Sequence, residues 1–173
     1  MNPATLHALA EFPRQLAHFY EAVPEAYRRW SPPSWEGIPS ETFTAIGQIC
    51  HVRDIEIDGY HVRLARTLAE DTPILESLDG YQLATQRDYQ GASAAEALSA
   101  FAVARSRTMQ IISSVTPADL ERQAVFEGYG PLTLRSLVHY LCSHDQQHLA
   151  GLQWLLGKID ASRAPGDVSQ KRT

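Results

Sequence analysis

The chain of 173 residues has little cysteine and no excess of positive charge. Two cysteines are too few for the disulfide framework that stabilises small secreted domains. The 15 basic residues are outnumbered by 20 acidic ones, which gives a net charge of -5 and no electrostatic footprint for nucleic acid or an anionic membrane. We therefore expect neither partner, and we expect Cys50 and Cys142 to be small core residues.

Long apolar runs are missing as well. Nowhere do about 18 uncharged apolar residues follow one another, as a membrane-spanning helix would need. The N-terminal MNPATLHALAEFPRQ lacks the basic start and the apolar core of a signal peptide. These absences predict a cytoplasmic protein. The length fits one domain with a substantial core, which we place at residues 1–160, followed by a polar, disordered tail at residues 161–173.

Apolar residues recur at steps of three and four in several parts of the chain, which is the spacing of amphipathic helices. The stretches that show it are residues 6–23, 42–69, 93–115 and 133–159. In the first of them, Pro13 either kinks the helix or marks its true start. A turn-rich segment, FEGYGP, precedes the last. The sequence therefore predicts an all-α four-helix bundle with a short hairpin or turn segment before the last helix.

The last of these helices is the clearest element. Thr133 is a good N-cap, and Leu132 and Leu137 occupy the two positions of a hydrophobic staple. The seam of this helix keeps strict four-three spacing through Leu134, Val138, Leu141, Asp145, His148, Leu152, Leu155 and Ile159. Two polar residues interrupt the middle of this apolar seam, which indicates that the helix carries a functional site there.

His144 and His148 are four residues apart, so their imidazoles stack on one face of the helix, with Cβ atoms roughly 6 Å apart. Both share the apolar stripe with Leu141. Burying two imidazoles in such a stripe costs free energy unless each has a partner, and a metal ion would satisfy both through one lone pair each. The alternative is a pair of core histidines that hydrogen-bond to neighbours or face solvent on a slightly rotated helix.

A third ligand should come from another helix, because two histidines make a weak site whereas three leave an open position for water or substrate. His51 and His61 in the second helix are the candidates. They lie about 15 Å apart along the helix axis, so only one of them can join the pair. The helical wheel leaves the choice open, because His61 lies on the same side of the helix as apolar residues, whereas His51 lies on a side that carries both apolar and acidic residues.

Other metal sites fit the sequence less well. A zincin protease needs glutamate directly after the first histidine of H-E-x-x-H, and this chain has Asp145 there, whose shorter arm reaches a zinc-bound water less well. A carboxylate-bridged di-iron bundle needs Glu-x-x-His on two helices, and the sequence has no such tetrapeptide. Asp145 is better suited to hydrogen-bond an imidazole that binds the metal.

Two segments resemble the DinB-like superfamily. Residues 43–56, FTAIGQICHVRDIE, are similar to that family's motif W-[ST]-x6-H-x4-E, with Phe43 in place of tryptophan, a change that affects packing more than chemistry. Residues 128–152 match G-x-[VL]-T-L followed by H-D-x-x-H-x-x-[GQ]. The matching residues are Thr44, His51, Glu56, Gly130, Leu132, Thr133, Leu134, His144, Asp145, His148 and Gly151. The resemblance covers most of the chain.

The resemblance implies an up-down-down-up four-helix bundle with a divalent metal ion on three histidines. It therefore implies His51, rather than His61, as the third ligand beside His144 and His148. Three carboxylates are then candidates to hydrogen-bond and orient these ligands. They are Asp145, Glu56 and Asp54.

Three neutral imidazoles and an open position suit several divalent transition metals, of which we expect zinc or nickel. The resemblance implies enzymes, namely transferases and isomerases that use a low-molecular-weight thiol such as mycothiol or bacillithiol, and related hydrolases. We expect such an enzyme, acting on a small-molecule substrate and pairing as a homodimer. The alternative is a binding or stress-response protein in which the ion stabilises the bundle without turnover. A fourth protein ligand would favour this structural role, and an open fourth position would favour catalysis.

Overall fold

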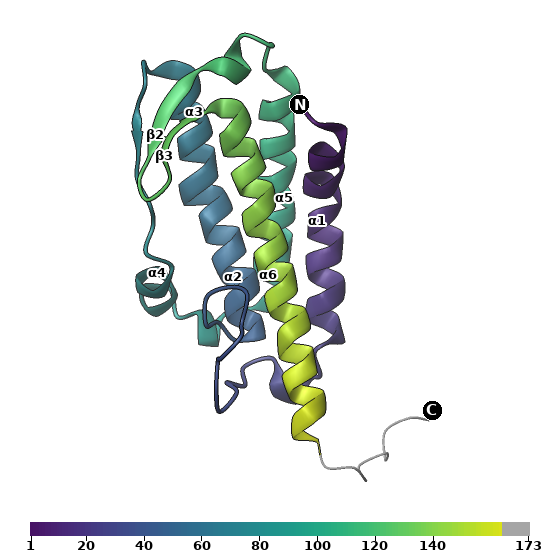
Figure 1. Ribbon diagram of the computed structural model, residues 1–173. Helices are drawn as coiled ribbons and strands as arrows, with labels where there is room; N and C mark the ends of the chain where they lie inside the picture. Colours follow the sequence, from purple (N-terminus) through teal and green to yellow (C-terminus); the bar gives the residue numbers. More distant parts are fainter. Residues whose placement is uncertain (164–173) are drawn as a thin grey trace.

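The computed structural model describes residues 1–163, which form a bundle of four long helical segments with a small sheet at one end (Figure 1). The bundle consists of α1 (Pro3–Ala22), α2 (Ala45–Asp54) continued by η2 (Ile55–Tyr60) and α3 (His61–Ala69), α5 (Ala94–Ser114) and α6 (Leu134–Ser162). The shorter elements are η1 (Glu25–Tyr27), β1 (Ile74–Leu75), α4 (Gly80–Gln86), η3 (Tyr89–Gly91), η4 (Asp119–Glu121), β2 (Gln123–Phe126) and β3 (Gly130–Thr133). Most of the predicted tail, residues 164–173, lies outside the described residues.

The helices run in the predicted up-down-down-up order. In Figure 1, α1 and α6 run from the sheet end toward the opposite end, whereas α2 with α3 and then α5 run the other way. Residues 70–93 make this possible, because they return along the whole bundle from the end of α3 to the start of α5 and carry β1, α4 and η3 on the way. As a result α2 packs against α5, and α1 packs against both α5 and α6.

The helix starts follow the polar caps in the sequence. Ser93 Oγ accepts a hydrogen bond from the backbone N–H of Glu96, and Thr133 caps α6 in the same way. The second helix begins at Ala45, a few residues later than predicted, because Thr44 is its N-cap. The first helix begins at Pro3, so Pro13 lies inside it and does not mark its start.

The second helix is not the single regular α-helix that the sequence predicted. Residues Ile55–Tyr60 form the π-helical turn η2, which holds more residues per turn than an α-helix and so changes the direction of the side chains that follow. On a helical wheel with regular α-helical spacing, Ile57 falls on the same side as the buried residues Tyr60 and Leu64. In the structure Ile57 is 38% exposed, whereas Ile55 is buried. Val62 is exposed as well. The expected homodimer stays a prediction.

The predicted hairpin before the last helix is present, as part of a sheet of three short strands. β2 pairs antiparallel with β3, and β1 pairs parallel with β2. Gly128 and Gly130 have φ angles of 82° and 81°, a left-handed conformation that glycine adopts without strain. Because Thr133 is both the last residue of β3 and the N-cap of α6, the hairpin fixes where α6 begins.

A buried ionic cluster joins the four helical segments. Arg105 of α5 is 1% exposed and donates two hydrogen bonds to Glu56 of η2, at 2.8 and 3.0 Å. It donates two more to Asp145 of α6, at 2.6 and 3.0 Å, and one to the carbonyl of Leu9 in α1, at 3.0 Å. Burial lowers the pKa of this guanidinium, but the two carboxylates raise it by more, so Arg105 stays charged.

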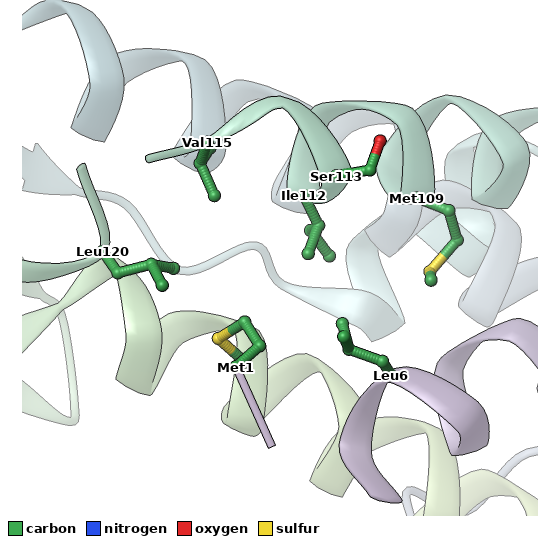
Figure 2. Close-up of a pocket in the computed structure, with 7 residues that line it drawn as sticks. All are labelled: Met1, Leu6, Met109, Ile112, Ser113, Val115 and Leu120. Atoms are coloured by element: carbon green, nitrogen blue, oxygen red, sulfur yellow. The ribbon is translucent and has the colours of Figure 1, made fainter. Parts of the chain in front are cut away.

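One apolar hollow lies away from the polar interior. It measures about 290 Å³ and lies between α1, the end of α5 and η4 (Figure 2). Its lining residues are Met1, Leu6, Met109, Ile112, Ser113, Val115 and Leu120. These side chains include no acid, base, histidine or cysteine, so the candidate chemistry lies elsewhere. None of the helices within residues 1–163 combines the length and apolarity needed to cross a bilayer.

The ionic cluster leads to a stability prediction. Arg105→Met should lower the free energy of unfolding by about 3–5 kcal/mol, because it leaves two buried carboxylates without their counter-ion. Urea denaturation of the metal-free protein measures this loss. Arg107→Met is the matched control, since Arg107 lies on the same helix but is exposed. Equal stability of the two variants would contradict the structural role of Arg105.

Candidate metal centre

Three histidines from two helices meet inside the bundle. His51 lies on α2, and His144 and His148 lie on consecutive turns of α6. The Nε2 atoms of His144 and His51 are 3.3 Å apart, and those of His148 and His144 are 3.1 Å apart. One ring nitrogen from each of the three lies within 4.8 Å of the other two. The structure therefore brings together the pair that the H-x3-H spacing indicated and the third histidine that the resemblance implied.

Burial keeps these imidazoles neutral. His148 is fully buried, His51 is 2% exposed, and His144 is partly exposed. Burial lowers the pKa of His144 and of His148 well below 6.5, and the neighbouring imidazoles lower it further. Burial also lowers the pKa of His51, against the opposing effect of nearby carboxylates. Neutral imidazoles carry the lone pairs that a metal ion requires.

Gln48 sets the tautomer of His148. Its Nε2 atom donates to Ser40 Oγ at 2.9 Å and to the carbonyls of Glu41 and Phe43 at 3.3 Å. These three acceptors fix the orientation of the amide, so its Oε1 atom must be the acceptor that faces His148 Nδ1. His148 therefore carries its proton on Nδ1 and leaves the Nε2 lone pair directed toward the other two histidines.

His51 is held mainly by packing. The ring of Phe43 lies over its imidazole, with the ring centroids 5.0 Å apart. Gly80, at the start of α4, covers it so closely that a Cβ there would lie 2.6 Å from His51 Cε1. Among the described residues, His51 Nδ1 has no hydrogen-bond partner. The phenylalanine in the tryptophan position of the motif thus serves to pack a histidine in place.

The other histidine considered for the site has different partners. His61 Nε2 lies 3.0 Å from the carbonyl oxygen of Ala104 and 3.1 Å from Thr108 Oγ1, both on α5. It therefore points away from the cluster. The two cysteines do not belong to the cluster either, and burial raises the pKa of Cys50 to about 11 and also raises that of Cys142.

The three carboxylates expected behind the ligands make other contacts. Asp145 and Glu56 bind Arg105, and Asp54 accepts a hydrogen bond from the hydroxyl of Tyr89 at 2.7 Å. Within residues 1–163, none of them accepts a hydrogen bond from a histidine of the cluster. Gln48 supplies that contact at His148 instead. Sequence reasoning missed Gln48, which lies three residues before His51, because its burial against His148 follows from the packing of α2 on α6.

The spacing of the cluster fits a divalent transition metal ion. A tetrahedral ion with metal–nitrogen bonds of about 2.0–2.1 Å holds its ligands about 3.3 Å apart. The two Nε2–Nε2 distances of 3.1 and 3.3 Å agree with that value. Neutral imidazole nitrogens are also donors that zinc, nickel, cobalt and copper accept. His51, His144 and His148 would therefore hold the ion.

The contact between Gln48 and His148 leads to a prediction about affinity. Gln48→Leu should weaken zinc binding by about 10–100-fold, because His148 loses the acceptor that fixes its tautomer. Competition with a chromophoric chelator measures the affinity. Gln146→Leu is the control, since Gln146 lies on α6 beside the histidines but is exposed. An affinity equal to that of the control would show that the amide does not support the site.

Comparison with known proteins agrees with this fold. The solved structure of YfiT from Bacillus subtilis, described as a probable metal-dependent hydrolase with an unusual four-helix bundle topology, superposes with a TM-score of 0.80. The alignment covers 92% of this chain and 90% of that chain at 17% sequence identity, so the likeness concerns the fold. No curated protein gives a significant match.

The family comparison is more specific. The family model of the DinB superfamily matches residues 8–152, a stretch that includes all three clustered histidines. This stretch covers most of the chain and agrees with the two motifs that suggested the resemblance. The chain therefore belongs to the DinB superfamily.

Proposed function

We propose that this protein is a metal-dependent hydrolase whose three clustered histidines bind a divalent transition metal ion, zinc or nickel. The observation that carries the proposal is the convergence of three neutral imidazoles at the spacing of metal ligands. The description of YfiT as a probable metal-dependent hydrolase supports the reaction class. We further propose that the substrate is a small molecule and that the protein acts in the cytoplasm.

The chemistry divides between the ion and the side chains around it. When bound, the ion would polarise a substrate oxygen and lower the pKa of a coordinated water or thiol toward neutrality. His51 and His148 provide buried donors on the inner side of the cluster. His144 is partly exposed, and we propose that solvent and substrate approach the cluster from its side. Gln48 keeps the His148 lone pair directed inward, and Phe43 excludes water from one face of His51.

The thiol-dependent transferase implied by the family resemblance would use the same three ligands. The two reactions differ only in the nucleophile, which is water in one and a low-molecular-weight thiol in the other. Neither cysteine of the chain belongs to the cluster, so such a thiol would have to come from outside. A protein that is only stabilised by its ion would have the same ligands and no turnover. Activity measurements must therefore separate three cases.

The ligand set itself is testable by elemental analysis. His51→Ala and His148→Ala should each lose stoichiometric metal, because two histidines make a much weaker site than three. His61→Ala should keep it, since His61 contacts α5 instead of the cluster. Retention of full metal content in His51→Ala, or its loss in His61→Ala, would refute the assignment.

Activity should depend on the metal. A panel of ester and amide substrates should be hydrolysed by the metal-loaded protein, and turnover should fall to background after chelation and return with zinc or nickel. His148→Ala should stay at background throughout. The panel is repeated with bacillithiol or mycothiol and an electrophile. Turnover only with a thiol would replace the hydrolase with a transferase, and a metal-dependent rise in melting temperature without turnover would leave a structural ion.

A further inference from the structure

A carboxylate from a loop lies against the histidine cluster. Glu41 belongs to the segment between η1 and α2, and its side chain is 37% exposed. Its Oε1 atom is 3.7 Å from His51 Nε2, and its Oε2 atom is 3.4 Å from His148 Nε2. The sequence offers no signal for this contact, because Glu41 lies outside both family motifs.

This arrangement places electron-rich atoms face to face. His148 carries its proton on Nδ1, where Gln48 accepts it, so its Nε2 atom presents a lone pair to the carboxylate. Among residues 1–163, no group donates a hydrogen bond to either carboxylate oxygen of Glu41. Oxygen and nitrogen lone pairs that point at one another repel unless a cation lies between them. A metal ion between the Glu41 carboxylate and the His148 nitrogen would remove this repulsion.

The Glu41 carboxylate lies near two of the three histidines, His51 and His148, so a small rotation of its side chain would bring one oxygen into a shared ligand shell. The two Nε2–Nε2 distances are 3.1 and 3.3 Å, and the closer contact from Glu41 to a ligand nitrogen is 3.4 Å. All three are close to the distance of about 3.3 Å between two ligand atoms of a tetrahedral zinc site, whereas the contact from Glu41 to His51 is longer, at 3.7 Å. We propose that the Glu41 carboxylate is the fourth ligand of the resting site and that an incoming substrate must displace it. This inference rests on the metal binding proposed above.

The loop is built to deliver this carboxylate. The carbonyl of Glu41 accepts hydrogen bonds from Phe43 N at 2.8 Å and from Gln48 Nε2 at 3.3 Å, and Ser40 Oγ accepts another from Gln48 Nε2. On α6, Gly151 leaves room for the loop, because a Cβ there would collide with Ser40 Oγ. The backbone around Glu41 is therefore held on α2 by Gln48, and the loop packs closely against α6 at Gly151.

The side chain of Glu41 is freer than its backbone. The side chain is 37% exposed, so rotation about its own torsions can remove the carboxylate from the histidines without moving the loop. A fourth protein ligand that a substrate can displace is compatible with catalysis, although it fills the coordination shell of the resting site. Weak ligands would not displace the carboxylate from the fourth position, whereas a substrate with higher affinity for the ion would.

Cobalt substitution tests the proposal with readouts other than activity. Loaded with Co(II), the wild-type protein should show the intense visible bands of a four-coordinate ion. Glu41→Gln should shift and weaken them as solvent enters the vacated position. Neutral imidazole should then bind to Glu41→Gln about tenfold more tightly than to wild type, as expected if the carboxylate occupies the position about nine-tenths of the time. Imidazole carries no charge, so the altered charge at residue 41 does not bias its binding.

Glu36→Gln is the matched control, because it makes the same charge change at an exposed position of the same segment. It should keep both the wild-type spectrum and the wild-type imidazole affinity. A Glu41→Gln variant that binds Co(II) with the wild-type spectrum and imidazole affinity would overturn the role of Glu41 and leave the three-histidine site intact. Failure of wild-type protein to bind Co(II) would instead overturn the metal site, and the inference with it.

Discussion

The bundle must satisfy two polar side chains that α6 carries into its core, Asp145 and His148. Each is almost fully buried, and a buried polar or charged group without a partner costs several kcal/mol. Asp145 accepts hydrogen bonds from the guanidinium of Arg105, which also donates to Glu56 in η2 and to the carbonyl of Leu9 in α1. His148 meets the amide of Gln48 on one side and the histidine cluster on the other. These two sets of contacts place α2, α5 and α6 relative to one another, so the same contacts determine the helix packing and the position of the histidine cluster.

Gln48 connects the ligands to the surface loop. A single amide fixes the tautomer of His148 with its oxygen and binds the backbone of the loop around Glu41 with its nitrogen. A movement of the loop around Glu41 would therefore shift the Gln48 amide and disturb its hydrogen bond with His148. A movement of His148 would in turn disturb the loop. This connection uses the two ends of one planar group, so neither contact can change without the other. The proposed displacement of the Glu41 side chain alone would leave the contacts of Gln48 unchanged.

The order of elements along the chain explains why the site faces one side of the bundle. The long return segment from α3 to α5 places α4 beside α2, where Gly80 and Phe43 enclose His51. The segment before α2 contributes Glu41 on the remaining side. Side chains from helices thus form the inner half of the centre, and loops form the outer half. Rigid donors with an adjustable outer boundary suit a site that has to admit a substrate.

Local periodicity in the sequence determined the α6 seam, its N-cap and the inward position of His144 and His148, because these depend on residues three or four apart on one helix. The choice of His51 needed the family motif, since the π-helical turn in the second helix invalidates a wheel with regular spacing. Only the tertiary structure assigned Arg105 to Asp145 and brought Gln48 and Glu41 to the histidines. Those contacts join side chains from separate elements, and no spacing rule within one helix specifies which side chains meet when the elements pack together.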